Sequence, residues 1–146
     1  MKIRITRLPH GKDLPLPQFE TPGAVGFDFV AAKDTEIPPR EIARISTGLV
    51  ISTPANHALI IAPRSSTPKK KHLDMPHSIG IIDQDYCGPQ DEILIQVRNF
   101  SDETVWVKRG EKIAQGMFVK IEKAIWEEME HHEIEANTRG GFGSTG

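Results

Sequence analysis

The chain has 146 residues, of which 38% are hydrophobic without counting glycine, and its 18 basic and 20 acidic side chains give a formal net charge of −2. These values are typical of one globular domain with a sizeable core. They give no support for non-specific binding to nucleic acid or to a membrane, so a bound phosphate would need a local site.

Short strand patterns follow one another along the chain, and their residues are 2–6, 57–62, 93–98, 105–107 and 113–121. Turn signals such as Pro22-Gly23 and Gly88-Pro89 separate them. No long amphipathic helix is visible before Ile121. Many short strands in one domain predict an all-β sandwich, jelly roll or barrel.

Residues 123–135 fit either a helix face or a continued strand, and they include His131 and His132 in a mostly acidic run. The histidine spacing matches no strong metal motif, so we expect a solvated stretch. Cys87 is the only cysteine, which excludes an intrachain disulfide. Because no membrane-spanning run and no signal-peptide core are visible, we expect a cytoplasmic protein.

Five polar or glycine-rich clusters interrupt the strands. In the first, Asp28 lies between two phenylalanines. A buried carboxylate there needs a cationic partner or a metal, although the residues alone favour an outward-facing Asp on an edge strand. In the second, Arg64, Ser65 and Ser66 could grip phosphates beside three lysines, and a basic surface loop explains the pattern equally well.

The third cluster, residues 80–88, has the pattern of a hairpin that presents polar groups. On a strand, Asp83 and Asp85 would point to the same face, where they repel unless a cation or a proton separates them. An ionised Asp can accept a proton from water at neutral pH. An Asp-rich turn is the alternative, and the functional interpretation is favoured.

The fourth cluster, residues 109–116, carries Gln115 as a neutral donor, and an ordinary hairpin explains it almost as well. The fifth is the tail, residues 139–146, which joins four glycines to Arg139, Phe142 and two hydroxyl residues. Such a segment could wrap a small anion that has a flat ring, or it could be a solvated chain end.

Together the clusters supply an acid pair, phosphate contacts and a stacking ring, which fits a nucleoside polyphosphate with a divalent cation. A Walker A sequence, a zinc-deaminase signature and a G-x-S-x-G elbow are all missing.

All five clusters, in this order, resemble the five motifs of the homotrimeric dUTP diphosphatases (dUTPases), from about Pro22 to Gly146. The resemblance implies an all-β, distorted jelly roll (a dUTPase-like β-clip) over residues 1–130 and a flexible C-terminal arm, 131–146, that carries a lid. It also implies a homotrimer in which all three subunits build each active site. The implied reaction converts dUTP and water to dUMP and pyrophosphate by attack at the α-phosphorus, with Mg²⁺ on the phosphates.

The resemblance also implies roles for single residues. Asp83 is the implied base that activates the attacking water. Tyr86 would lie beneath the deoxyribose and exclude a 2′-hydroxyl, and Asp28 would hold Mg²⁺ through water. The other implied substrate contacts come from Arg64, Ser65, Ser66, Gln115, Arg139 and Ser144 at the phosphates, from the backbone around Gly80, Ile82 and Asp83 at the uracil edge, and from Phe142 and Gly143 in the tail.

Four departures from the family pattern stand out. His77 occupies the place of an asparagine near the uracil pocket, and Ser66 that of a glycine. The segment 87–92 is longer than the common form, and Arg139 lies closer to Phe142 than the usual tail arginine.

Two rival functions remain. The Arg64-Ser65-Ser66 sequence suits dCTP deaminase or its bifunctional deaminase–diphosphatase form, but Gln96 stands where that enzyme needs a proton-shuttling carboxylate. A non-catalytic trimeric binding protein is the other rival. Joint retention of five motif residues argues against it, and these are Asp28, Asp83, Tyr86, Gln115 and Phe142.

Overall fold

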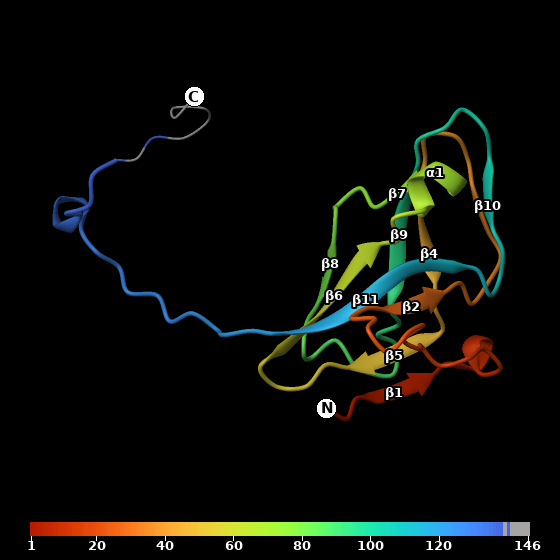
Figure 1. Ribbon diagram of the computed structural model, residues 1–146, viewed down its shortest axis with the longest axis horizontal. Coiled ribbons are helices and arrows are strands. Elements are labelled where there is room, and N and C mark those ends of the chain that lie inside the picture. The colour runs from red at the N-terminus through yellow and green to blue at the C-terminus, as the bar shows by residue number, and fades with distance from the viewer. Residues whose placement is uncertain (139, 141–146) are drawn as a thin grey trace.

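The computed structural model describes residues 1–138 and 140, and they fold into a body of short β-strands with an extended C-terminal arm (Figure 1). The strands are β1 (Arg4–Arg7), β2 (Phe27–Val30), β3 (Thr35–Ile37), β4 (Ile42–Ser46), β5 (Leu49–Ser52), β6 (His57–Pro63), β7 (Leu73–Asp74), β8 (Gly80–Ile82), β9 (Leu94–Asn99), β10 (Val105–Val107) and β11 (Lys112–Lys120). The helical elements are α1 (Thr67–Lys71) and two 3₁₀ turns, η1 (Pro9–Gly11) and η2 (His131–Glu133). The predicted all-β class is confirmed.

The strands pair antiparallel in four small sheets that wrap around one core. The largest sheet has the order β2-β11-β6-β8, and a second has the order β4-β9-β7. Two further pairs, β1-β5 and β3-β10, close the body. Each strand pattern found in the sequence overlaps one of these strands.

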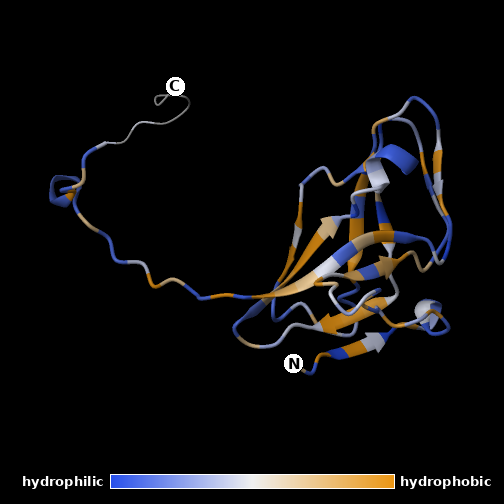
Figure 2. Ribbon diagram, in the orientation of Figure 1, coloured by the Kyte–Doolittle hydropathy of each residue, from blue (hydrophilic) through white to orange (hydrophobic). Residues whose placement is uncertain are grey.

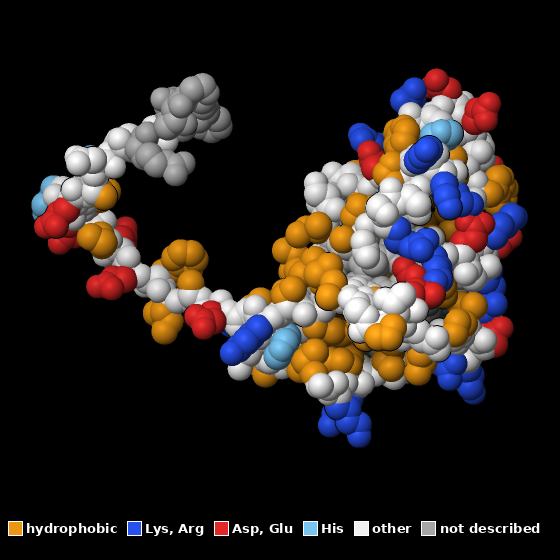
Figure 3. Space-filling view, in the orientation of Figure 1, with side chains coloured by type: hydrophobic (Ala, Val, Ile, Leu, Met, Phe, Trp, Pro, Cys, Tyr) orange, Lys and Arg blue, Asp and Glu red, His pale blue; other side chains and the backbone are white. Residues whose placement is uncertain are grey.

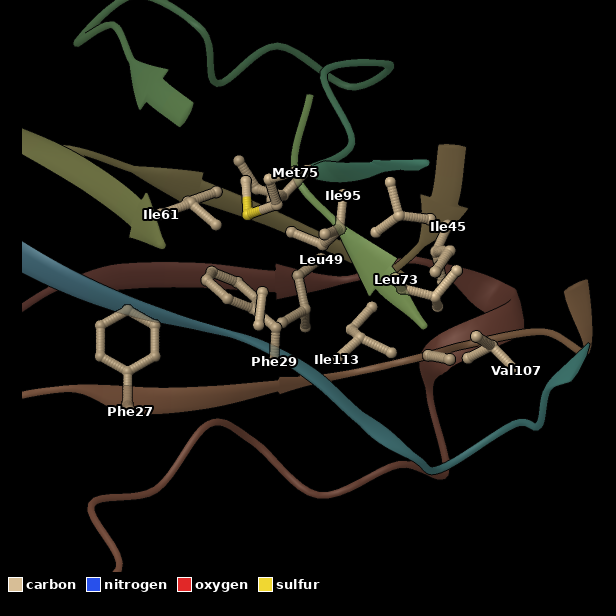
Figure 4. Packing of buried hydrophobic residues seen from close by; sticks show 14 of the residues in the cluster. Phe27, Phe29, Ile45, Leu49, Ile61, Leu73, Met75, Ile95, Val107 and Ile113 are labelled. Atoms are coloured by element: carbon tan, nitrogen blue, oxygen red, sulfur yellow. The ribbon is translucent and has the colours of Figure 1, made fainter. Parts of the chain in front are cut away.

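Alternating apolar residues from facing sheets fill the core, as the hydropathy colouring and the close-up show (Figures 2 and 4). In β9 and just before it, Ile93, Ile95 and Val97 are buried while Leu94 and Arg98 are exposed, which is the period of a half-buried strand. Each fully buried side chain of this size stabilises the fold by about 1.5–3 kcal/mol. The remaining large members of the core are Phe27, Phe29, Ile37, Ile45, Leu49, Ile51, Leu59, Ile61, Leu73, Met75, Val107 and Ile113.

Gly116 lets β11 lie close over two core rings. A Cβ at this position would lie 2.7 Å from a ring carbon of Phe29 and 2.8 Å from Phe27, which is closer than side chains approach. The glycine therefore permits the tight packing of β11 on β2. In that register Gln115 lies opposite Asp28.

The third polar cluster is not the hairpin that the sequence predicts. β8 pairs with β6, whereas β9 pairs with β4 and β7, so these two successive strands are not partners in the described part of the chain. β8 ends at Ile82, and Asp83 and Asp85 follow it in a turn. The expectation that both carboxylates share one strand face is wrong, because alternation of side chains ends with the strand.

The arm begins after β11 and leaves the body (Figures 1 and 3). Every residue from 122 to 138 is exposed, including Ile125 and Trp126, and η2 is the one regular element in this stretch. It is neither the helix nor the continued strand considered above. No helix in the described residues is long and apolar enough to cross a membrane.

Candidate active site

A cluster of opposite charges joins three strands of the largest sheet. The Asp28 carboxylate on β2 lies 2.9 Å from Nε of Arg64, which follows β6, and 2.9 Å from Nζ of Lys112 at the start of β11. The Asp28 side chain is only 14% exposed. β2 is the edge strand that the residues alone favour, but its Asp28 side chain is largely shielded rather than outward-facing, and it has the cationic partners that a shielded carboxylate requires.

Lys112 reaches Asp28 through a β-bulge. The register of β11 on β2 shifts between Lys112 and Ala114, so that Lys112 lies opposite Val30. Val30 and Asp28 share a face of β2, so the extra residue turns Lys112 to the side of the carboxylate. A hydrogen bond to Glu20, and then the one to Asp28, raise the pKa of Lys112 above its usual value.

Gln115 lies in the centre of this cluster. Its backbone is opposite Asp28 on one side and Ala62 on the other. Its side-chain amide donates to the Pro63 carbonyl at 3.1 Å. The amide is thereby held at the end of β6, next to the residue that pairs with Asp28.

The residues after β6 form an exposed polar turn. The Thr67 amide donates to the Arg64 carbonyl at 3.0 Å, Ser65 is exposed, and Ser66 precedes α1 without capping it. Both serine hydroxyls are thus available beside Arg64. Of the three lysines, Lys71 is engaged elsewhere, since its Nζ lies 2.5 Å from the Glu111 carboxylate.

The turn after β8 presents Asp83 to solvent. The Tyr86 amide donates to the Asp83 carbonyl at 3.3 Å, and the Gln84 side chain donates to the His57 carbonyl at 3.1 Å. Asp83 and Asp85 line a groove of about 610 Å³ between β6, β8 and the start of the arm. The turn is fixed at its base while Asp83 is exposed.

The register of β8 on β6 separates Asp83 from Arg64. Gly80 lies opposite Ile61 and Ile82 opposite Leu59, so Asp83 continues toward Ala58. Arg64 leaves the other end of β6. At ~3.3 Å per residue, the strand from residue 58 to residue 64 spans about 20 Å. One chain therefore does not bring these two predicted site residues together.

His77 and Gly80 lie at the Arg64 end of β8. The exposed His77 ring has Nδ1 2.7 Å from the Ile79 carbonyl, and its Cε1 lies 3.9 Å from where a Cβ on Gly80 would stand. Ile82 is half-buried and packs against the core. The predicted tail residues Arg139, Phe142, Gly143 and Ser144 lie outside the described residues.

Among the described residues, no group of three or more His, Cys, Asp or Glu side chains could hold a metal. Mg²⁺ usually keeps several waters and binds through one or two carboxylates plus substrate phosphates. Both Asp28 oxygens already contact cations, so the fit to a phosphate-bound metal is a contact through water rather than direct ligation.

Lys112, Glu20 and Glu92 are the residues of interest that sequence reasoning missed. Lys112 lies inside the fourth cluster, so its place in the chain could have been noticed. The bulge that turns its side chain toward Asp28 could not be predicted from the sequence. Glu20 belongs to no motif. Glu92 closes the unusually long segment 87–92, which was the one signal that pointed to it.

Comparison with known proteins shows the family to which the chain belongs. The dUTPase family model matches residues 12–146. A deoxyuridine 5'-triphosphate nucleotidohydrolase from Methylocella silvestris is 39% identical over 150 residues, which cover 100% of this chain and 92% of that protein.

Solved structures also resemble this fold. A dUTPase from Streptococcus mutans is 32% identical with a TM-score of 0.79, covering 84% of this chain and 98% of that one. A mutant dUTPase from phage phi11 of S. aureus, described with a structural Mg(II) ion, is 21% identical with a TM-score of 0.79, covering 91% and 99%. The likeness confirms the predicted jelly-roll fold.

Proposed function

This chain belongs to the dUTPase family, and from that premise we propose how its residues carry out the reaction. The protein is a dUTP diphosphatase, which hydrolyses dUTP to dUMP and pyrophosphate. The observation that carries this conclusion is the meeting of Asp28, Arg64 and Gln115, from three separate motifs, at one place on the central sheet. The family model spans all three.

The triphosphate binds at the end of β6. Arg64 supplies a charge-assisted fork, Ser65 and Ser66 supply hydroxyl donors, and the Gln115 amide supplies a neutral donor. Asp28 holds the Arg64 guanidinium in place before substrate arrives, which supports a preorganised phosphate site. Mg²⁺ on the phosphates, held by Asp28 through water, would neutralise charge that develops as the phosphoanhydride breaks.

Asp83 is the proposed base. Its carboxylate is exposed on a turn whose flanks are fixed by hydrogen bonds from Gln84 and Tyr86. A carboxylate so placed can orient a water at the α-phosphorus and take its proton. Tyr86 would lie under the deoxyribose. The backbone from Gly80 to Ile82 would contact the uracil edge, and His77 would lie near the uracil pocket.

We propose that the working enzyme is a homotrimer with shared sites. The two ends of β6 hold Arg64 and Asp83 apart, so a complete site needs Asp83 from one subunit and Arg64 from another. The exposed arm, residues 122–138, leads away from the body, which supports delivery of the tail lid with Phe142 to a neighbouring subunit. The predicted division into a domain, 1–130, and a flexible C-terminal arm, 131–146, is a different boundary from the exposed stretch 122–138 and stays a prediction, as does a cytoplasmic location.

The deaminase alternative lacks its proton-shuttling carboxylate, because residue 96, on β9, is a glutamine. The deciding experiment measures pyrophosphate and ammonia released from dUTP and from dCTP, with Mg²⁺ and with excess chelator. We expect metal-dependent pyrophosphate from dUTP and no ammonia from dCTP. Ammonia from dCTP would place the protein among the deaminases, and no release from either substrate would favour a binding protein.

A further inference from the structure

Glu92 is the centre of a polar network outside the phosphate cluster. A single carboxylate oxygen, Oε1, accepts from the Ser46 hydroxyl at 2.5 Å and from the Gly48 amide at 2.7 Å, and it lies 3.0 Å from Nε2 of His10. The Glu92 side chain is 17% exposed. This one carboxylate ties the segment before β9 to the β4–β5 connection and to η1.

Ile93, the next residue, adds two hydrogen bonds to the same β4–β5 region, and we call these contacts of Glu92 and Ile93 the clamp. The Ile93 amide donates to the Leu49 carbonyl at 2.8 Å, and the Thr47 hydroxyl donates to the Ile93 carbonyl at 2.6 Å. Ile93 itself is fully buried. Residues 92 and 93 are thus fixed by both their backbone and their side chains.

Tyr86 rests on this clamp. Its hydroxyl donates to the Glu92 carbonyl at 3.0 Å, across the loop of residues 87–91. Inside that loop, the Gly88 amide donates to the Asp91 carboxylate at 2.7 Å, so Asp91 shapes the loop without contributing to the clamp. Tyr86 is 38% exposed, and its hydroxyl is tied to the carbonyl of Glu92.

We propose that Glu92 is a positioning residue for Tyr86: its anchored backbone carbonyl holds the tyrosine ring against the sugar and thereby sets the preference for dUTP over UTP. The inference rests on the proposed function, in which Tyr86 excludes the 2′-hydroxyl. Glu92 touches no substrate, and it acts by fixing the acceptor of the Tyr86 hydroxyl. The segment 87–92 is longer than in the family pattern, and in this proposal it connects Tyr86 to Glu92, the residue that fixes its hydroxyl.

The test compares kcat/KM for dUTP and for UTP in the full-length enzyme, and its readout is the ratio of the two. Glu92→Ala is expected to lower the ratio about tenfold, the size of a modest steric discrimination, with kcat for dUTP near wild type because Asp83 is untouched. Tyr86→Phe, which loses the same hydrogen bond, is expected to lower it similarly. The double variant should show no further loss, since both changes break one interaction.

Three further variants sharpen the result. Glu92→Gln keeps a side-chain acceptor for Ser46 and the Gly48 amide, so it should retain most of the dUTP-to-UTP ratio. Asp91→Ala, a neighbouring carboxylate in the same loop, should leave the ratio unchanged. If Glu92→Ala does not fold, Ser46→Ala removes one donor from the anchor and should lower the ratio in the same direction.

Three outcomes would count against these claims, and they separate the inference from the proposed function. A ratio lowered by Tyr86→Ala but unchanged by Glu92→Ala would overturn this inference alone, as would additive losses in the double variant. A ratio unchanged by Tyr86→Ala would overturn the role of Tyr86 in the proposed function, and the inference with it.

Discussion

Asp28 on β2 and Arg64, in the turn after β6, form an ion pair of 2.9 Å that spans the intervening strand β11. The carboxylate is mostly buried, and its second oxygen contacts Lys112. Because each carboxylate oxygen contacts a cation, we expect Asp28 to hold the Arg64 guanidinium in place before a phosphate arrives. The arrangement links the first, second and fourth motifs in one chain.

Replacing Asp28 with Asn should release Arg64 and weaken the contact to metal. We expect kcat/KM for dUTP to fall about tenfold or more, and the Mg²⁺ concentration for half-maximal activity to rise. Steady-state kinetics across a Mg²⁺ series measures both. Glu36→Gln, an exposed carboxylate on β3, serves as the control. Unchanged metal dependence would remove Asp28 from the metal site.

Asp83→Asn keeps the size of the side chain and removes the proposed base. Turnover should fall by at least about 10², while dUTP binding stays largely intact. Asp85→Asn, in the same turn, is the matched control and should change turnover only slightly. Single-turnover rates with calorimetric binding separate the two effects, and unchanged turnover in Asp83→Asn would exclude the base role.

The Glu92 carboxylate makes the free energy of unfolding depend on pH in the acid range. Burial raises the pKa of Glu92, but hydrogen bonds from Ser46, His10 and the Gly48 amide outweigh it and hold the pKa below its ordinary 4.5. A lowered folded-state pKa means that the stabilisation is fully present above 4.5 and is lost as pH falls through the folded value. Denaturant unfolding at a series of pH values should show a shallower acid loss in Glu92→Gln. Identical slopes in both proteins would contradict this.

Removing residues 140–146 should abolish most activity and leave the body folded. The strands that close the core end at Lys120, and residues 122–138 contribute no buried side chain. Phe142→Ala in the intact chain should mainly weaken dUTP binding, as loss of a base-stacking ring does. Circular dichroism and sedimentation check fold and assembly, and loss of the proposed trimer on truncation would make the tail structural.

The sequence predicts what depends on local pattern. Ile93, Ile95 and Val97 alternate with exposed residues, and β9 forms there. It does not predict what depends on register or distant pairing. A bulge in β11 aims Lys112, and the contact of His10 with Glu92 joins residues 82 positions apart.

The third motif shows where a local rule fails. The sequence pattern places Asp83 and Asp85 on one strand face, but β8, which pairs with β6 and not with β9, ends at Ile82. Likewise, the sequence does not predict that Asp83 and Arg64 lie at opposite ends of β6. That placement depends on the order of strands in the sheet, which the whole fold determines.

The most direct measurement mixes two inactive variants, Asp83→Asn and Arg64→Ala, by joint refolding or co-expression. If each site takes Asp83 from one subunit and Arg64 from the next, about a quarter of the sites in randomly mixed trimers combine both native residues. Mixed samples should therefore recover activity well above that of either variant alone. Absence of any recovery in verified mixed oligomers would contradict the shared site.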